Sequence, residues 1–180
     1  LEPSTRTKSS FELAEKRLSA DSLSAGGSTS SVVKGESLAD TIQTISAMNV
    51  DMFVCRARLA GTPQRITENT DAVVINAGDG KHQHPTQALL DLYTIRKHFG
   101  HLDGLKVAIV GDLAHSRVCG SLAPALKTMG AKVTLVGPPT FQVDDPDWFG
   151  CPQTAHFDDV IEDMDVIYML RVQLERMEGA

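Results

Sequence analysis

Hydrophobic positions along the 180-residue chain alternate between helical and strand-like spacing. Apolar residues Phe11, Leu13, Ala14 and Leu18 recur with a helical period behind a hydroxyl-rich start, which predicts a first helix. A stripe of apolar residues within 36–48 predicts a second helix. Four later helices are expected around 63–69, 85–98, 118–129 and 158–162. Pro85 suits a first helical turn, and Gly100 and Gly130 suit helix ends.

Short apolar runs between these helices predict strands at 51–55, 72–77, 106–110, around 133–136 and at 165–170. The runs are continuous rather than alternating, which is typical of parallel sheets covered on both faces by helices. The Gly- and Ser-rich stretch 24–31 predicts a loop. We therefore expect the α/β class with two lobes, divided near residue 100 into 1–100 and 101–180, the second lobe being incomplete.

Composition narrows the class of protein. Hydrophobic residues make up 42% of the chain and the formal net charge is −6, which favours a globular protein and disfavours a general nucleic-acid binder. No apolar run is long enough to span a bilayer and no secretory signal precedes the first helix, so we expect a cytoplasmic protein without a membrane partner. Cys55, Cys119 and Cys151 lie far apart, which predicts reduced thiols in or near the core.

Polar segments follow several of the predicted strands, and ligands of open α/β sheets bind at the carboxyl ends of strands. These segments begin at Arg56 and cover 78–87, 111–117 and 171–176. A further candidate is the start of the first helix, residues 4–7, where unpaired N–H groups, hydroxyls and an arginine suit a phosphate. Taken alone, this tetrapeptide is better explained as an ordinary helix cap, because capping motifs are common.

Each of the other segments can also be explained by a purely structural role. His84 and Gln87 stand three residues apart at a helix start and suit a small carbonyl-and-amide group, or only a cap. His82 and His84 lack a third metal ligand nearby, so no metal is expected. Residues 111–117 lack the glycine spacing of a dinucleotide turn, which disfavours nucleotide binding. Arg117 is either an anion ligand or a surface arginine. Two arginines and an amide within 171–176 suit a dicarboxylate, but as an isolated feature they more often form a solvated face.

Together and in this order, the motifs STRT, SxxxKGE, GDGxxxHPTQALLDLYTI, GDLxxSR and YMxRVQxER resemble the aspartate carbamoyltransferase family from Ser4 to Arg176. The RVQxER segment favours the aspartate branch over the ornithine branch. The chain resembles an internal piece that lacks the family's first helix and strand and its later His-Pro-Leu-Pro-like loop. Two departures are Ala57, where relatives often have His, and Leu174, where Lys is usual.

The resemblance implies transfer of a carbamoyl group from carbamoyl phosphate to L-aspartate in pyrimidine biosynthesis, without a metal or other cofactor. It implies catalytic roles for Arg6, Thr7, Arg56 and His84. The substrate-binding residues that it implies are Ser4, Thr5, Arg6, Thr7, Ser30, Lys34, Arg56, His84, Gln87, Arg117, Arg171 and Gln173. All of these side chains are expected to converge on one anion-binding site.

Ser30 and Lys34 fall, by the same resemblance, on a loop that reaches the site of a neighbouring subunit. We therefore expect a homotrimer with shared active sites, with a regulatory chain as a possible further partner. Two alternatives remain open. One is an ornithine carbamoyltransferase-like enzyme. Two arginines beside a cationic co-substrate argue against it. The other is a non-catalytic homologue or assembly fragment.

Overall fold

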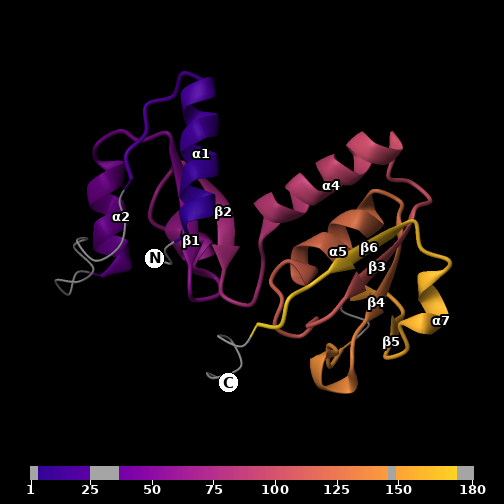
Figure 1. Cartoon of the computed structure of the whole chain (residues 1–180). Helices are drawn as coiled ribbons and strands as arrows, with labels where there is room; N and C mark the ends of the chain where they lie inside the picture. The colour runs from indigo at the N-terminus through magenta and orange to yellow at the C-terminus, as the bar shows by residue number, and fades with distance from the viewer. Residues whose placement is uncertain (1–3, 25–36, 146–148, 174–180) are drawn as a thin grey trace. The chain divides into compact units, whose positions relative to one another are not determined.

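The computed structural model describes residues 4–24, 37–145 and 149–173, and the chain forms two compact units, Leu1–Asp79 and Gly80–Ala180 (Figure 1). Each unit contains a parallel sheet and helices, so the predicted α/β class is confirmed. The helix expected to close the first domain packs within the second unit. The domain boundary near residue 100 stays a prediction.

The first unit is built on two parallel strands. It comprises α1 (Thr5–Arg17), α2 (Leu38–Ser46), β1 (Met52–Ala57), α3 (Thr62–Thr67) and β2 (Val73–Asp79). Strand β1 pairs with β2 in parallel, with Cys55 opposite Asn76. A small core joins β1 to α2 and α3 through Ile42, Cys55, Ala57 and Ile66, and the partly buried Val74 of β2 packs against it. Both strands run two residues further than the apolar runs predict, which includes Arg56 within β1 and Asp79 within β2.

The second unit has a larger core around a four-stranded parallel sheet in the order β5-β4-β3-β6. Its elements are α4 (Pro85–Phe99), β3 (Lys106–Val110), α5 (Cys119–Thr128), β4 (Lys132–Val136), the 3-10 turn η3 (Pro139–Phe141), β5 (Gln153–Thr154), α7 (Asp158–Ile161) and β6 (Val166–Met169). Pro85 begins α4, and Gly100 ends it with a left-handed φ of 82°. Sequence patterns missed η3 and β5, because two- and three-residue elements carry no periodicity.

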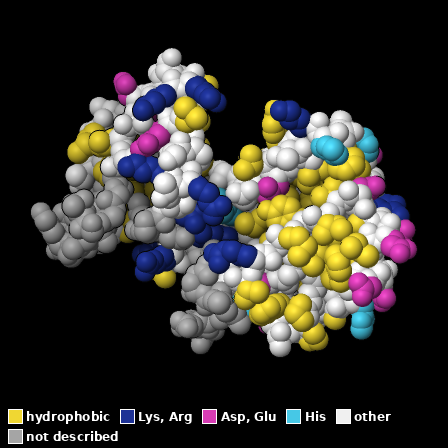
Figure 2. Space-filling model, in the orientation of Figure 1, with side chains coloured by type: hydrophobic (Ala, Val, Ile, Leu, Met, Phe, Trp, Pro, Cys, Tyr) yellow, Lys and Arg dark blue, Asp and Glu magenta, His cyan; other side chains and the backbone are white. Residues whose placement is uncertain are grey.

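Strand β6 differs from the prediction of a strand covered on both faces. It is an edge strand whose exposure alternates, and Ile167 and Met169 are 39% and 66% exposed. Figure 2 shows hydrophobic side chains gathered on the face of the second unit that carries this strand. No element among the described residues covers that face of β6. Likewise, no helix in the described parts of the chain is long and apolar enough to cross a membrane.

The centre of the second unit depends on α5 and β3. Leu122 and Leu126 of α5 and Val107 and Ile109 of β3 are all 0% exposed. We expect Leu122→Ala to lower the free energy of unfolding by about 3–5 kcal/mol, because the substitution loses apolar contacts and leaves a cavity. Leu89→Ala on α4 is the control, since Leu89 is 64% exposed and should change stability by less than about 0.5 kcal/mol. Urea unfolding measures both, and equal midpoints would contradict this packing.

The three cysteines are free and buried, as the sequence predicts. Burial raises the pKa of the Cys55 thiol to about 11 and that of Cys119 to about 12, and burial also raises the pKa of Cys151. Because the thiolate is the reactive form, the folded chain at pH 8 should react with an aromatic disulfide reagent far more slowly than the urea-unfolded chain. Rapid labelling of any cysteine in the folded chain would contradict this arrangement.

Candidate functional site

The first unit joins the hydroxyl-rich start of α1 to the arginine of β1. Ser4 caps α1, and its side-chain oxygen accepts a hydrogen bond from the backbone N–H of Thr7 at 3.4 Å. Arg56 Nη1 donates to Thr7 Oγ1 at 3.1 Å and to the carbonyl oxygen of Ala77 at 3.5 Å. The first N–H groups of a helix lack intrahelical acceptors, so a guanidinium at this helix end adds to a cluster of donors that suits an anion.

The structure says less about the other site residues that are predicted for this unit. Thr5 and Arg6 lie exposed in the first turn of α1, on the same turn as Thr7. Ser30 and Lys34, predicted to reach a neighbouring subunit, lie outside the described residues. The structure thus brings together Ser4, Thr7 and Arg56, while the predicted roles of Ser30 and Lys34 stay predictions.

A buried carboxylate fixes the carboxyl ends of β1 and β2; it belongs to the GDG segment of the sequence, which predicted no such role for it. Asp79 is 1% exposed and accepts hydrogen bonds from the backbone N–H of Gly61 at 2.9 Å and from Asn76 Nδ2 at 3.0 Å. Gly61 adopts a left-handed φ of 77° at the start of α3. Asp79 therefore ties the loop after Arg56 to the end of the neighbouring strand.

In the second unit, His84 and Gln87 lie at the start of α4, where the pattern places them. His84 is the N-cap residue, and its backbone N–H donates to Ser121 Oγ at 2.9 Å. Gln87 Nε2 donates to Asp91 Oδ1, one turn further along α4, at 2.9 Å. Within the described residues, no group of three or more His, Cys, Asp or Glu side chains could hold a metal ion.

The loop before α4 packs closely on the start of α5. Arg117 Nη1 donates to the carbonyl oxygen of Gly80 at 3.4 Å, and Arg117 is only 4% exposed. The interpretation of Arg117 as a surface arginine is therefore wrong, because neighbouring loops cover it. A Cβ atom on Gly120 would lie 2.5 Å from the carbonyl oxygen of His82, so only glycine allows this close approach. These contacts join the segment 80–84 to the segment 117–121.

Asp112 joins the loop after β3 to the segment after β6. It is 0% exposed and accepts three hydrogen bonds, from the backbone N–H of His115 at 3.2 Å, from His115 Nδ1 at 2.7 Å and from the backbone N–H of Gln173 at 2.9 Å. Strands β3 and β6 are neighbours in the sheet, so their carboxyl ends adjoin. The carboxylate thus holds two of the predicted segments against each other.

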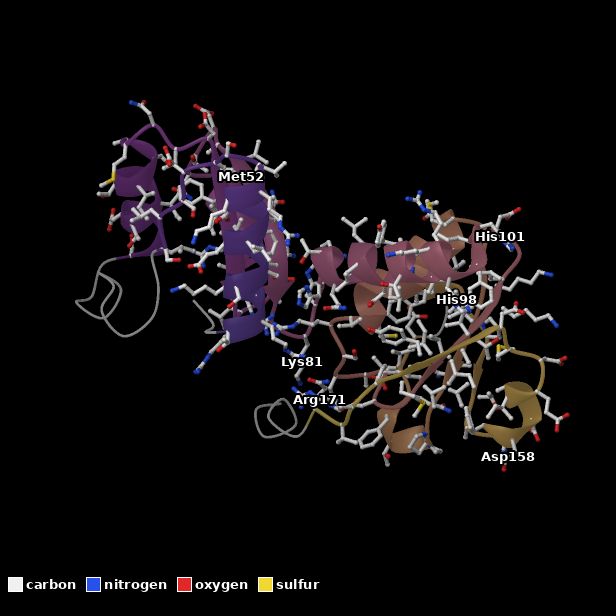
Figure 3. All side chains as sticks on the ribbon, turned by 45° about the horizontal axis from the view of Figure 1, so that its top comes forward. Met52, Lys81, His98, His101, Asp158 and Arg171 are labelled. Atoms are coloured by element: carbon white, nitrogen blue, oxygen red, sulfur yellow. The ribbon has the colours of Figure 1, made fainter. Side chains whose placement is uncertain are left out.

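The two predicted residues after β6 differ in exposure. Arg171 is exposed near the end of β6 and donates through Nη1 to the carbonyl oxygen of Val172 at 3.3 Å (Figure 3). Gln173 is 7% exposed, and its Nε2 donates to the carbonyl oxygen of Arg171 at 3.3 Å. Its Oε1 is buried and accepts no hydrogen bond from the described residues. A buried acceptor of this kind is available to a ligand N–H group.

Sequence reasoning missed the residues that hold the segments in place, chiefly Asp79, Asp91, Asp112 and Ser121. One signal was present for Asp112, because it comes two residues after a buried strand, where the carboxyl edge of a parallel sheet is expected. Asp91 lies within a helical pattern, and a charged residue there ordinarily indicates a solvated face.

The role of Asp112 can be tested by removing its charge. Asp112→Asn keeps one acceptor oxygen but turns an NH2 group toward hydrogen-bond donors. We expect the free energy of unfolding to fall by roughly 1–3 kcal/mol. Asp144→Asn is the matched control, since Asp144 is exposed and its change should stay within about 0.5 kcal/mol. Thermal and urea unfolding measure the stability of both variants. If both were as stable as the parent chain, this role of Asp112 would be contradicted.

Comparison with protein families matches both parts of the chain. The carbamoyl phosphate-binding domain of aspartate/ornithine carbamoyltransferases matches residues 1–97. The Asp/Orn-binding domain of the same enzymes matches residues 103–179.

Individual relatives agree with this result. The aspartate carbamoyltransferase catalytic subunit of Sorangium cellulosum is 52% identical over 179 residues, and that of Desulforapulum autotrophicum is 51% identical over 178. Each alignment covers 99% of this chain but only 56% and 57% of the relatives, so the chain spans a little over half of their length.

Solved structures show the same fold. The M. Jannaschii aspartate transcarbamoylase catalytic subunit superposes with a TM-score of 0.84 at 41% identity, over 99% of this chain and 61% of its own. Trypanosoma cruzi aspartate transcarbamoylase in complex with carbamoyl aspartate and phosphate gives a TM-score of 0.89 at 35% identity, over 98% of this chain and 61% of its own. The chain therefore belongs to the aspartate/ornithine carbamoyltransferase family.

Proposed function

We propose that this chain carries substrate-binding and catalytic residues of an enzyme that joins carbamoyl phosphate to L-aspartate, giving N-carbamoyl-L-aspartate and phosphate in pyrimidine biosynthesis. The observation that carries the proposal is the 51–52% identity, along 99% of the chain, to relatives named aspartate carbamoyltransferase. Trypanosoma cruzi structures named for complexes with carbamoyl phosphate and aspartate support the choice of substrates.

The first unit is proposed to bind the phosphate group. The N-terminus of α1 offers backbone N–H donors and hydroxyls from Ser4, Thr5 and Thr7, and Arg6 adds a cation on the same turn. Arg56 already contacts Thr7 Oγ1 at 3.1 Å. A dianionic phosphate gains charge-assisted hydrogen bonds there, and the same donors stabilise it as it leaves.

Polarisation of the carbamoyl carbonyl is assigned to Arg56, Thr7 and His84. Negative charge develops on that oxygen as the amine attacks, and a donor aimed at it contributes roughly 3–4 kcal/mol to transition-state stability. Gln87 is assigned to the carbamoyl NH2 group. The departing phosphate is the proposed acceptor for the amine proton, so the reaction needs neither a covalent intermediate nor a metal.

Aspartate is assigned to Arg117, Arg171 and Gln173. Arginine binds carboxylates with two parallel hydrogen bonds, and two arginines suit the two carboxylates of aspartate. Asp112 supports this assignment by holding the backbone of Gln173 beside the loop that leads to Arg117. Fixing both carboxylates positions the α-amine, which converts a two-body encounter into an oriented one.

Assembly and location belong to the same proposal. We propose a homotrimer in which Ser30 and Lys34 of one chain complete the site of its neighbour, and a cytoplasmic enzyme that could also bind a regulatory chain. Shared sites give a physical reason for a closed cyclic oligomer. The first physical check is the oligomeric state in solution.

An assay with two acceptors tests the chemistry. The chain is incubated with radiolabelled carbamoyl phosphate and with either L-aspartate or L-ornithine. We expect product with aspartate alone, because two arginines disfavour a cationic co-substrate. Arg56→Ala should lower kcat by about 10²- to 10³-fold, since it removes a donor to the developing oxyanion. The control is Arg65→Ala, an exposed arginine of α3 that should leave the rate unchanged.

Three results would contradict the proposal. Carbamoylated ornithine would favour the ornithine branch. Equal rates for the Arg56 and Arg65 variants would remove Arg56 from the mechanism. Absence of turnover together with absence of carbamoyl phosphate binding by calorimetry would favour a non-catalytic role in assembly.

A further inference from the structure

A half-buried carboxylate on α4, Asp91, contacts one of the proposed substrate-binding residues and has no role in the chemistry described so far. Its Oδ1 accepts a hydrogen bond from Gln87 Nε2 at 2.9 Å. Its Oδ2 accepts a hydrogen bond from the hydroxyl of Tyr168 on β6, also at 2.9 Å. Both oxygens of the carboxylate therefore have a donor, one from the same helix and one from the edge strand.

The two hydrogen bonds that Asp91 accepts, one on each oxygen, are the arrangement of an ionised carboxylate. Burial raises the pKa of Asp91 above its usual value, while the hydrogen bonds from Gln87 and Tyr168 lower it. Burial and then the charge of Asp91 raise the pKa of the Tyr168 hydroxyl. Tyr168 consequently stays protonated at neutral pH and remains a donor, which reserves Oδ2 for the tyrosine and Oδ1 for Gln87.

An ionised carboxylate can only accept hydrogen bonds, and this property fixes the side-chain amide of Gln87. Only the NH2 end of the amide can face Asp91, because the opposite orientation would place two acceptor oxygens in contact. The carbonyl end, Oε1, must then point away from Asp91. Among the described residues, no donor is bonded to Oε1, so this oxygen is available to an N–H group of a ligand.

We infer that Asp91 is a positioning residue that presents Gln87 Oε1 to the NH2 group of carbamoyl phosphate and thereby sets the preference for a carbamoyl group over an acyl group without N–H donors. The inference rests on the proposed function, in which Gln87 binds that NH2 group. Acetyl phosphate has the same phosphate and carbonyl but carries a methyl group in place of NH2. A free amide of Gln87 could rotate and would distinguish the two ligands less well.

The test is a set of calorimetric titrations of the chain with carbamoyl phosphate, acetyl phosphate and inorganic phosphate. Asp91→Asn should reduce the preference for carbamoyl over acetyl phosphate by about 3- to 10-fold, the value of one well-placed hydrogen bond. The affinity for inorganic phosphate should stay unchanged. In a Gln87→Ala background, Asp91→Asn should produce no further loss of preference, since Asp91 acts through Gln87.

A control variant and a spectroscopic measurement complete the design. Tyr168→Phe removes the tyrosine donor but leaves the Asp91–Gln87 hydrogen bond, so it should retain the preference. In the unmodified chain, the side-chain NH2 protons of Gln87 should exchange with water more slowly than those of Gln64, which is exposed on α3. This measurement needs no change at Asp91 and holds even if the Asn variant fails to fold.

The outcomes separate the two levels of proposal. If the parent chain prefers carbamoyl phosphate but Asp91→Asn weakens all three ligands equally, or leaves the preference intact, the role of Asp91 is wrong and the proposed function stands. Equal exchange rates for Gln87 and Gln64 would also overturn the role of Asp91. If the parent chain binds carbamoyl phosphate no better than acetyl phosphate, the proposed binding of the carbamoyl group itself fails.

Discussion

Three hydrogen bonds to the buried carboxylate of Asp112 hold the carboxyl edge of the second unit together. Parallel pairing makes β3 and β6 end at the same edge, but it does not determine how the polar segments after them are arranged. Asp112 supplies that arrangement, because a fully buried carboxylate is stable only where donors satisfy its oxygens. The donors come from the segments proposed to bind aspartate, so the stability of the carboxylate and the geometry of the site depend on the same contacts.

Acidic side chains also hold separate segments together elsewhere in the chain. Asp79 ties the loop after β1 to the end of β2, and Asp91 ties Gln87 to the edge strand through Tyr168. In each case a partly or fully buried acid accepts hydrogen bonds from donors of separate segments. Because these acids are hydrogen-bonded within the fold, a net charge of −6 does not exclude a locally positive site for a phosphate or a dicarboxylate.

Much of the architecture could be predicted, since continuous apolar runs and the helix ends at Pro85 and Gly100 are local signals. The sites proposed for Ser4, Thr7, Arg56, His84 and Gln87 were also suggested by their places at helix starts and strand ends. The supporting residues could not be predicted, because Asp91 and Asp112 are defined by partners 77 and 61 residues away in sequence. The burial of Arg117 was missed for the same reason. The exposed face of β6 was missed because a continuous apolar run does not show whether helices cover both faces of the strand.

Hydrogen–deuterium exchange of the backbone amides, with and without N-(phosphonacetyl)-L-aspartic acid, tests most directly whether these segments bind the proposed substrates. This compound joins a phosphonate to aspartate and is present in a Trypanosoma cruzi aspartate transcarbamoylase structure. Slower exchange is predicted at 5–8, 84–88, 112–117 and 171–173, where backbone amides lie beside the proposed ligand groups. Unchanged exchange in all four segments, with slower exchange instead around Ser46, Asp51 and Asp71, which line a hollow at the opposite ends of β1 and β2, would contradict it.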